Sequence, residues 1–144
     1  MGAMYSVHPL IEKIKLWLDE QSIEYPADIN GRNPTLSEIQ QSLGQLVGYS
    51  SNMTVAEIGK PWQAFIEDRM DPEKKGWAIL NIINLTNSNN EFYFEKGCPD
   101  LIVRFTVLLT KYTGPLVLIC DAGGPPLVVT ASANPQALFE SWGY

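Results

Sequence analysis

The sequence predicts an α+β domain in which N-terminal helices precede a ββαββα unit, with an antiparallel sheet packed against the helices. Two observations lead to this class: apolar residues recur at helical spacing in the first half, and short apolar runs between turn residues dominate after Gly76. With 144 residues, 45% of them hydrophobic and 18% charged, the chain has the size and composition of one globular domain. We therefore predict a single domain over residues 4–144, with residues 1–3 left by cloning ahead of a native start at Met4.

The first helix is predicted from Ser6 to about Gln21. Charged residues lie opposite an apolar stripe formed by Val7, Leu10, Ile11, Ile14, Trp17 and Leu18. Ser6 can cap this helix, and Pro9 is tolerated in its first turn. His8, the only histidine, then lies in the first turn, where a solvated surface group is the simplest interpretation. We assign His8 no functional role.

Two further helices are predicted in this half. Thr35 and Glu38 have capping-box spacing, so each can satisfy an unpaired backbone donor at the start of the second helix. Gly48 suits the position just after this helix, and its buried stripe is predicted to comprise Leu36, Ile39, Leu43, Leu46 and Val47. A shorter third helix is predicted to start near Pro61 and to carry Trp62, Phe65 and Ile66.

The second half is predicted to supply the sheet. Four short apolar runs between turn residues are expected strands: Trp77–Ile83, Glu91–Glu95, Leu116–Cys120 and Leu127–Thr130. The asparagine-rich segment 84–90 is a turn, because asparagine tolerates left-handed backbone. A short final helix is expected after the capping residue Asn134, with Pro135 first and with Leu138 and Trp142 buried.

Between the two strand pairs, Cys98-Pro99-Asp100 opens a predicted helix that ends at Thr113. Proline in the first helical position and an acid in the first turn are both typical of a helix start, and Gly114-Pro115 is a strong stop. A strand is the alternative for this segment, because Val, Ile, Phe and Thr are frequent in it.

The net charge of −6, from 16 acidic and 10 basic residues, argues against nucleic acid as a direct ligand and favours a basic protein partner. A helix-turn-helix would need basic or amide side chains after the second helix, where the chain carries Glu57, Glu67 and Asp68 instead. No apolar run reaches the roughly 18 residues needed to cross a bilayer, so no membrane segment is expected. With no visible signal peptide, the expected location is the cytoplasm; a chain from which a leader had been removed would look the same.

The candidate reactive groups are few. Cys98, at a predicted helix N-terminus, has the setting of a thiolate, but a cysteine nucleophile needs a base and His8 is the sole imidazole. Cys120 is assigned to the core. The loop Asp121-Ala122-Gly123-Gly124 is followed by a strand and lacks the helix that a phosphate-binding loop requires. We therefore predict no catalytic residue, metal or cofactor.

The candidate partner-binding residues are acidic side chains near residue 70, tyrosines that bring large contact area, and one acid at a loop tip. They are Glu67, Asp68, Asp71, Glu73, Tyr25, Tyr49 and Asp121. Trp62 is a further aromatic of the contact type, for which a place in the core is the preferred interpretation.

The layout from Trp77 onward is similar to that of small immunity proteins of bacterial toxin systems. The segment from Asn84 to Phe92 and the helix from Pro99 loosely resemble the SUKH group, whose glycine-tryptophan signature is not found near the N-terminus here. The resemblance implies an inhibitor that binds a toxin one to one and occludes its active site. Many such toxins are nucleases with basic clefts, which an acidic inhibitor suits. Two alternatives stay open: a self-associating subunit that pairs through a strand edge, and a thiol-dependent enzyme centred on Cys98.

Overall fold

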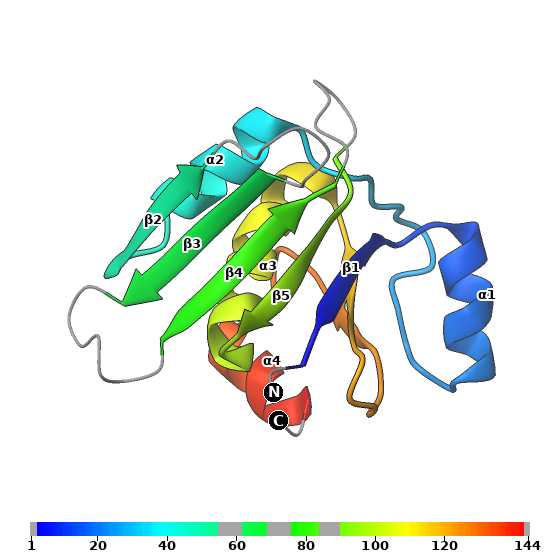
Figure 1. Cartoon of the computed structure of the whole chain (residues 1–144). Helices are drawn as coiled ribbons and strands as arrows, with labels where there is room; N and C mark the ends of the chain where they lie inside the picture. The colour runs from blue at the N-terminus through cyan, green and yellow to red at the C-terminus, as the bar shows by residue number, and fades with distance from the viewer. Residues whose placement is uncertain (1–2, 55–61, 69–75, 84–89, 143–144) are drawn as a thin grey trace.

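A computed structural model describes residues 3–54, 62–68, 76–83 and 90–142, without the side chains of Thr54 and Asp68. Within these ranges four helices accompany an antiparallel sheet of seven strands (Figure 1). The elements are, in chain order, β1 (Tyr5–Pro9), α1 (Glu12–Glu20), α2 (Leu36–Gly44), β2 (Tyr49–Thr54), β3 (Trp62–Asp68), β4 (Trp77–Ile82), β5 (Phe92–Gly97), α3 (Pro99–Thr113), β6 (Leu116–Cys120), β7 (Leu127–Val129) and α4 (Pro135–Trp142).

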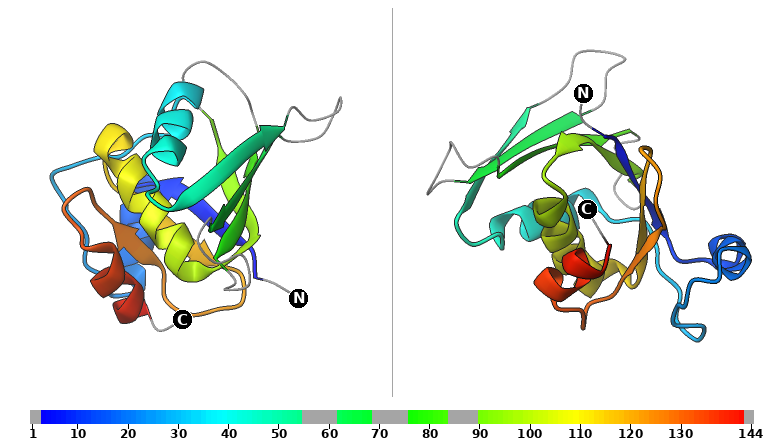
Figure 2. Two further views of the ribbon diagram at one scale, coloured as in Figure 1. Left: turned by 90° about the vertical axis from the view of Figure 1, so that its left-hand side faces the viewer. Right: turned by 90° about the horizontal axis from the view of Figure 1, so that it is seen from below.

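The sheet curves around α3, with α2 and α4 on either side of that helix (Figure 2). Alternate residues of the strands point to this concave side, where Ile66, Leu80 and Phe94 are completely buried. Phe105 of α3 meets Phe94 edge to face, at 5.8 Å between ring centroids. This layer of sheet against helices is the main core.

Helix α1 packs on the opposite side of the sheet. Its Leu18, with Leu10, lies against Val117 of β6, and Ile119 and Val128 pack at the border of this second, smaller cluster. Lys15 of α1 is 5% exposed, and its ammonium donates to the carbonyl of Ala27 and to Asn30 Oδ1. Helix α1 therefore covers only the end of the sheet formed by β6 and β7.

The strand order is β2-β3-β4-β5-β1-β6-β7, which places the N-terminal strand inside the sheet. Strand β1 pairs with β6 over five residue pairs but with β5 over only two, Tyr5 with Phe94 and Ser6 with Tyr93. Beyond Ser6 the strands β1 and β5 diverge, as Figure 1 shows. The sheet thus has a short seam between β2–β5 and the three remaining strands.

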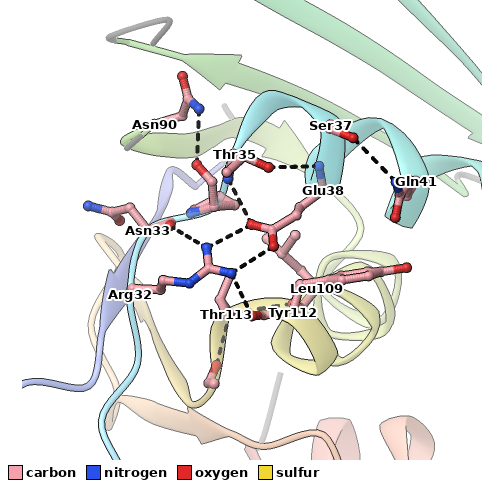
Figure 3. A network of polar contacts seen from close by, with 12 residues as sticks. Arg32, Asn33, Thr35, Ser37, Glu38, Gln41, Asn90, Leu109, Tyr112 and Thr113 are labelled. Carbon is pink, nitrogen blue, oxygen red and sulfur yellow. Dashed lines mark hydrogen bonds and ion pairs between the residues drawn. The ribbon is translucent and has the colours of Figure 1, made fainter. Parts of the chain in front are cut away.

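A polar network ties the start of α2 to the end of α3 (Figure 3). Arg32 donates to both carboxylate oxygens of Glu38, at 2.8 and 2.7 Å, and to the carbonyl of Tyr112 at 2.8 Å. Glu38 Oε1 also accepts from the backbone N–H of Thr35, and Thr35 Oγ1 accepts from the N–H of Glu38, which completes the capping box. The hydrogen bond from Arg32 holds the pKa of Glu38 at about 2, below its ordinary 4.5.

The α+β class and the antiparallel sheet are confirmed, but the predicted order with helices alone at the N-terminus is wrong. Residues 5–9 form a strand in which buried Tyr5 and Val7 alternate with half-buried Ser6 and His8. Helix α1 begins only at Glu12, so Ser6 caps no helix and His8 lies on a strand. Val7 of β1 lies three residues before Leu10, which precedes α1. This spacing equals that of a helix, so the apolar stripe looks continuous in the sequence although a strand ends and a helix begins within it.

The predicted third helix is also wrong, because Trp62–Asp68 is strand β3. Buried Ala64 and Ile66 alternate there with exposed Gln63, Phe65 and Glu67, the period of a half-buried strand. Strand β2 was not predicted at all. Pairing between β2, β3 and β4 stabilises the strand conformation of this region. The next described elements after α2 are therefore strands, whereas a helix-turn-helix would have its second helix there.

The second helix is confirmed with its capping box, but it ends at Gly44. Val47, expected in its buried stripe, is 93% exposed. Gly48 has a φ of 85° immediately before β2, so its left-handed backbone turns the chain into the strand. The strand alternative for residues 101–113 is excluded, since α3 runs from Pro99 to Thr113.

The remaining predicted elements of the second half correspond to β4, β5, β6, β7 and α4. Asn134 Oδ1 accepts from the N–H of Ala137, as expected of the cap of α4, and Trp142 is buried. The asparagine-rich turn lies outside the described residues except for Asn90, whose amide donates to the carbonyl of Pro34. None of the helices in the described part of the chain has the length and apolar character that crossing a membrane requires.

Candidate functional site

The side of β2, β3, β4, β5 and β1 that faces away from α3 is covered by none of the described helices, and we call it the open face. The strand register and burial pattern assign to it mostly polar and aromatic side chains: Ser6, His8, Asn52, Gln63, Phe65, Glu67, Trp77, Ile79, Asn81, Tyr93 and Glu95. A one-sided sheet of this kind normally pairs an apolar core side with a solvated polar side. Large apolar groups on the solvated side are therefore the informative feature.

Two aromatic rings lie together on the open face. Phe65 of β3 and Trp77 of β4 stack with centroids 6.3 Å apart and planes 23° apart. Phe65 is 42% exposed although it sits in the middle of a strand. Such a preformed aromatic pair offers contact area to a partner with little loss of side-chain entropy.

A row of hydrogen bonds crosses the same face. Gln63 donates to Asn81 Oδ1 at 2.9 Å, and Asn81 donates to Glu95 Oε2 at 3.3 Å. Asn81 is completely buried, so its amide is fixed between its two neighbours. The row holds the Glu95 carboxylate on the surface of the sheet.

The seam between β1 and β5 opens into a groove of about 410 Å³, which we call the seam groove. Its volume lies within the range of about 300–1,000 Å³ that is usual for ligand sites. Val7, Pro9, Ile83 and Phe92 provide apolar lining, and Ser6, His8, Glu91 and Tyr93 provide polar groups. Glu91 is the only ionised side chain among the described residues that line the groove.

His8 is the titratable group at this groove. Its Nε2 lies 3.2 Å from Ser6 Oγ. Burial lowers the pKa of His8 from 6.5, and the nearby Glu91 carboxylate raises it by less. The imidazole is therefore neutral at pH 7, a state in which one ring nitrogen donates and the other accepts.

A serine beside a histidine is part of a nucleophilic site, which also needs a group that orients the second ring nitrogen and donors for an oxyanion. None of the hydrogen bonds in the described residues supplies either group at His8. The described residues also contain no cluster of three or more His, Cys, Asp or Glu that could hold a metal ion.

Cys98 is not joined to this site. It is the residue before α3, half-buried against the main core, whereas His8 belongs to the open face. The structure therefore places the thiol and the only imidazole on opposite sides of the sheet. Cys120 is buried in the core, at the end of β6.

Acidic groups outnumber basic ones on the open face. Glu67, Glu91 and Glu95 are exposed on it or beside it. Lys96, which pairs with Ile79 next to a β-bulge, is the one Lys or Arg that the register of the described strands places there. A basic surface is the electrostatic complement of this face.

The structure does not bring the predicted contact residues together. Glu67 lies on the open face, while Tyr25 and Asp121 lie near the opposite end of the sheet. The hydroxyl of Tyr25 donates to Asp19 Oδ1 at 2.8 Å, and this bond raises the pKa of Tyr25. Asp121 is exposed, and its Oδ1 accepts from the N–H of Met4.

The other predicted contact residues contribute little to the open face as described. Tyr49 starts β2 and is half-buried against the main core, and Trp62 packs there too. The side chain of Asp68 and the whole of Asp71 and Glu73 lie outside the described residues.

Sequence reasoning missed His8 and the pairing of Phe65 with Trp77. A period-two signal was present for both strands: Tyr5 and Val7 alternate with Ser6 and His8, and Ala64 and Ile66 alternate with Gln63 and Phe65. The divergence of β1 from β5, which creates the groove, leaves no such signal.

No protein-family model, curated protein or solved structure matches this chain.

Proposed function

We propose that this chain is a non-enzymatic protein-binding domain whose open face binds a basic protein. In its most specific form the proposal is an immunity-type inhibitor that neutralises a cognate bacterial toxin by occluding its active site. The net charge of −6 and the resemblance described above support this form. The binding role itself rests on the open face.

The observation that carries the proposal is the stacking of exposed Phe65 on half-buried Trp77, on a sheet face that no described helix covers. Burying Phe65 would remove apolar surface from water, and aromatic anchors of this kind contribute most of the affinity in many interfaces. Glu67 and Glu95 beside the pair favour a basic partner and speed its association.

The open face is also organised before binding. The hydrogen bonds from Gln63 through Asn81 to Glu95 and the stacking of the two rings fix side chains that would otherwise lose freedom on association. Each immobilised side chain costs about 0.5–1.5 kcal/mol on binding, so fixing it beforehand raises affinity.

Affinity capture from bacterial lysate at low and moderate salt, compared between two variants, tests the proposal. Phe65→Ala removes an anchor from the open face, and Leu16→Ala removes an equally apolar side chain, 65% exposed, from the far side of α1. We expect one basic protein to be retained stoichiometrically by the wild type and by Leu16→Ala. Phe65→Ala should retain at least about tenfold less, as a hot-spot truncation does.

Equal retention by Phe65→Ala and Leu16→Ala would refute the open face as the binding surface. Retention that does not weaken with salt would refute the electrostatic part of the proposal. An inhibitor role makes a further demand: the captured protein must lose its own activity in a one-to-one mixture with this chain.

A self-associating subunit is the second candidate, and strand β2 is the observation that favours it. This six-residue edge strand, Tyr49–Thr54, carries no charge and no proline, the features that usually protect a sheet edge from pairing. Sedimentation at several concentrations distinguishes the two: a strict monomer contradicts self-association. The described contacts give no support to a thiol-dependent enzyme centred on Cys98.

A further inference from the structure

We infer that the seam groove is the anchor pocket for an arginine side chain of the basic partner. The inference rests on the proposed function and adds to it the chemistry that the groove recognises. It follows from the shape, the lining and the charge of the groove.

The apolar part of the lining suits the stem of a long side chain. Val7 and Pro9 of β1 and Ile83 and Phe92 on the β4–β5 side line the groove. Arginine buries its three methylene groups along such surfaces while its charged end reaches polar groups. The volume of about 410 Å³ leaves room for the whole side chain.

The polar part of the lining consists mainly of acceptors. Glu91 carries a negative charge, and no described lining residue carries a positive one. Ser6 Oγ and the neutral imidazole of His8 add further acceptor positions, and Tyr93 adds an aromatic ring. A guanidinium has five donors in one plane and stacks on aromatic rings, and it is less strongly hydrated than an ammonium group. This combination favours arginine over lysine.

The hydrogen bonds of Ser6 orient the imidazole for this role. Ser6 Oγ is placed to donate to the carbonyl of Ile119 at 3.5 Å. When it does so, His8 Nε2 must be the donor in the 3.2 Å contact with Ser6, which leaves Nδ1 as the acceptor. Protonation of His8 would remove that acceptor and add a repelling charge. Glu91, which precedes β5, and Tyr93 of β5 are the other titratable groups among the described residues that line the groove, and β6 presents apolar Val117 opposite His8.

The test is a titration of the full chain with N-acetyl-arginine methylamide, followed by NMR of the His8 imidazole. Since His8 is the only histidine, its ring signals need no assignment by mutation. N-acetyl-citrulline methylamide, which keeps the shape but not the charge, is the matched control, and the lysine analogue tests the preference for guanidinium. We expect saturable shifts for the arginine probe with a dissociation constant of about 1 mM, the strength usual for so small a ligand.

Two charge-matched variants separate contact from long-range attraction. Glu91→Gln removes the carboxylate that lines the groove, and Glu95→Gln removes one on β5 that lies outside the lining. We expect Glu91→Gln to weaken binding of the arginine probe by about fivefold, the upper range for an exposed ion pair. Glu95→Gln should weaken it by less than about twofold.

The inference is overturned if the arginine probe leaves the His8 signals unchanged, or if citrulline or lysine analogues bind as tightly. Equal effects of Glu91→Gln and Glu95→Gln also overturn it, because they would show general attraction by net charge. The titration needs no partner protein, so its failure is distinct from a failure of the capture experiment. A silent probe together with loss of capture in Phe65→Ala would reject the arginine pocket and leave the open-face proposal standing.

Discussion

Replacing Glu38 with glutamine removes one negative charge from the network that joins α2 to α3. Glutamine keeps the size of the side chain and can still accept from the N–H of Thr35, because both residues serve in a capping box. The substitution therefore isolates the ionic part of the contact with Arg32.

Two contributions set the size of the effect. A pKa lowered from 4.5 to about 2 corresponds to about 3 kcal/mol, which is an upper bound. The side chain of Arg32 is 50% exposed, and solvent weakens such a pair to about 1 kcal/mol. The charge also lies in the first turn of α2, where the helix dipole adds about 0.5 kcal/mol. We expect Glu38→Gln to lower the free energy of unfolding by about 1–2 kcal/mol at pH 7.

The pH dependence follows from the direction of the shift. Between pH 4.5 and 2 the folded chain keeps Glu38 ionised, whereas the unfolded chain protonates it. The contribution of Glu38 to the free energy of unfolding is therefore complete above pH 4.5 and is lost as the pH falls from 4.5 towards 2. The glutamine variant has no such contribution. The difference in stability between wild type and variant should therefore shrink by about half at pH 3.

Urea denaturation followed by tryptophan fluorescence at pH 7, 4.5 and 3 measures this difference. Glu140→Gln on α4 serves as the control, since Glu140 is exposed and accepts only from Gln136 in the described contacts. A loss below about 0.5 kcal/mol at pH 7, typical of a surface substitution, would refute the reasoning. A loss that stays constant between pH 7 and pH 3 would refute the assignment to ionised Glu38.

Three further predictions concern the fold and the seam groove. A Cβ at Gly31 would lie 1.9 Å from the backbone oxygen of Pro115, so Gly31→Ala should lower stability by about 3 kcal/mol or more; a melting temperature close to that of wild type would contradict this packing. Phe94→Ala empties a fully buried site and should cost about 3–5 kcal/mol in chemical denaturation, and a loss below about 1 kcal/mol would show that Phe94 is not in the core. By NMR the pKa of His8 should lie below 6.5, and Glu91→Gln should lower it further; a midpoint at or above pH 6.5 would contradict the burial of His8. Because the unfolded chain protonates His8 at a higher pH than the folded chain does, the free energy of unfolding should fall as the pH drops below 6.5.

Capping and helix-stop residues in the sequence predicted where α2 begins and where α3 begins and ends. The capping box of Thr35 and Glu38, and Pro99 and Gly114 around α3, are set by backbone groups within a turn or two of each residue. The sequence predicts helices where β1 and β3 lie, because helical and strand periods overlap over segments this short. Strand pairing far along the chain decides between them, as in the pairing of Tyr5 with Cys120.

The candidate site was harder to predict than the fold. Glu67 was expected on a contact surface for its charge, and it does lie on the open face. The groove arises because two strands separate after Ser6, and backbone divergence has no signature in residue type. The predicted helix would expose His8 in its first turn, whereas the observed strand places the His8 side chain in the lining of the groove.

The position of β1 inside the sheet has a consequence for how the chain folds during synthesis. β1 leaves the ribosome well before β6, with which it makes its longest pairing, because residues 10–115 are made between the two strands. Until β6 emerges, the described strands offer β1 only its two residue pairs with β5. The five residue pairs between β1 and β6 therefore form only after β6 has been made, and pairing between strands so far apart in the sequence slows folding.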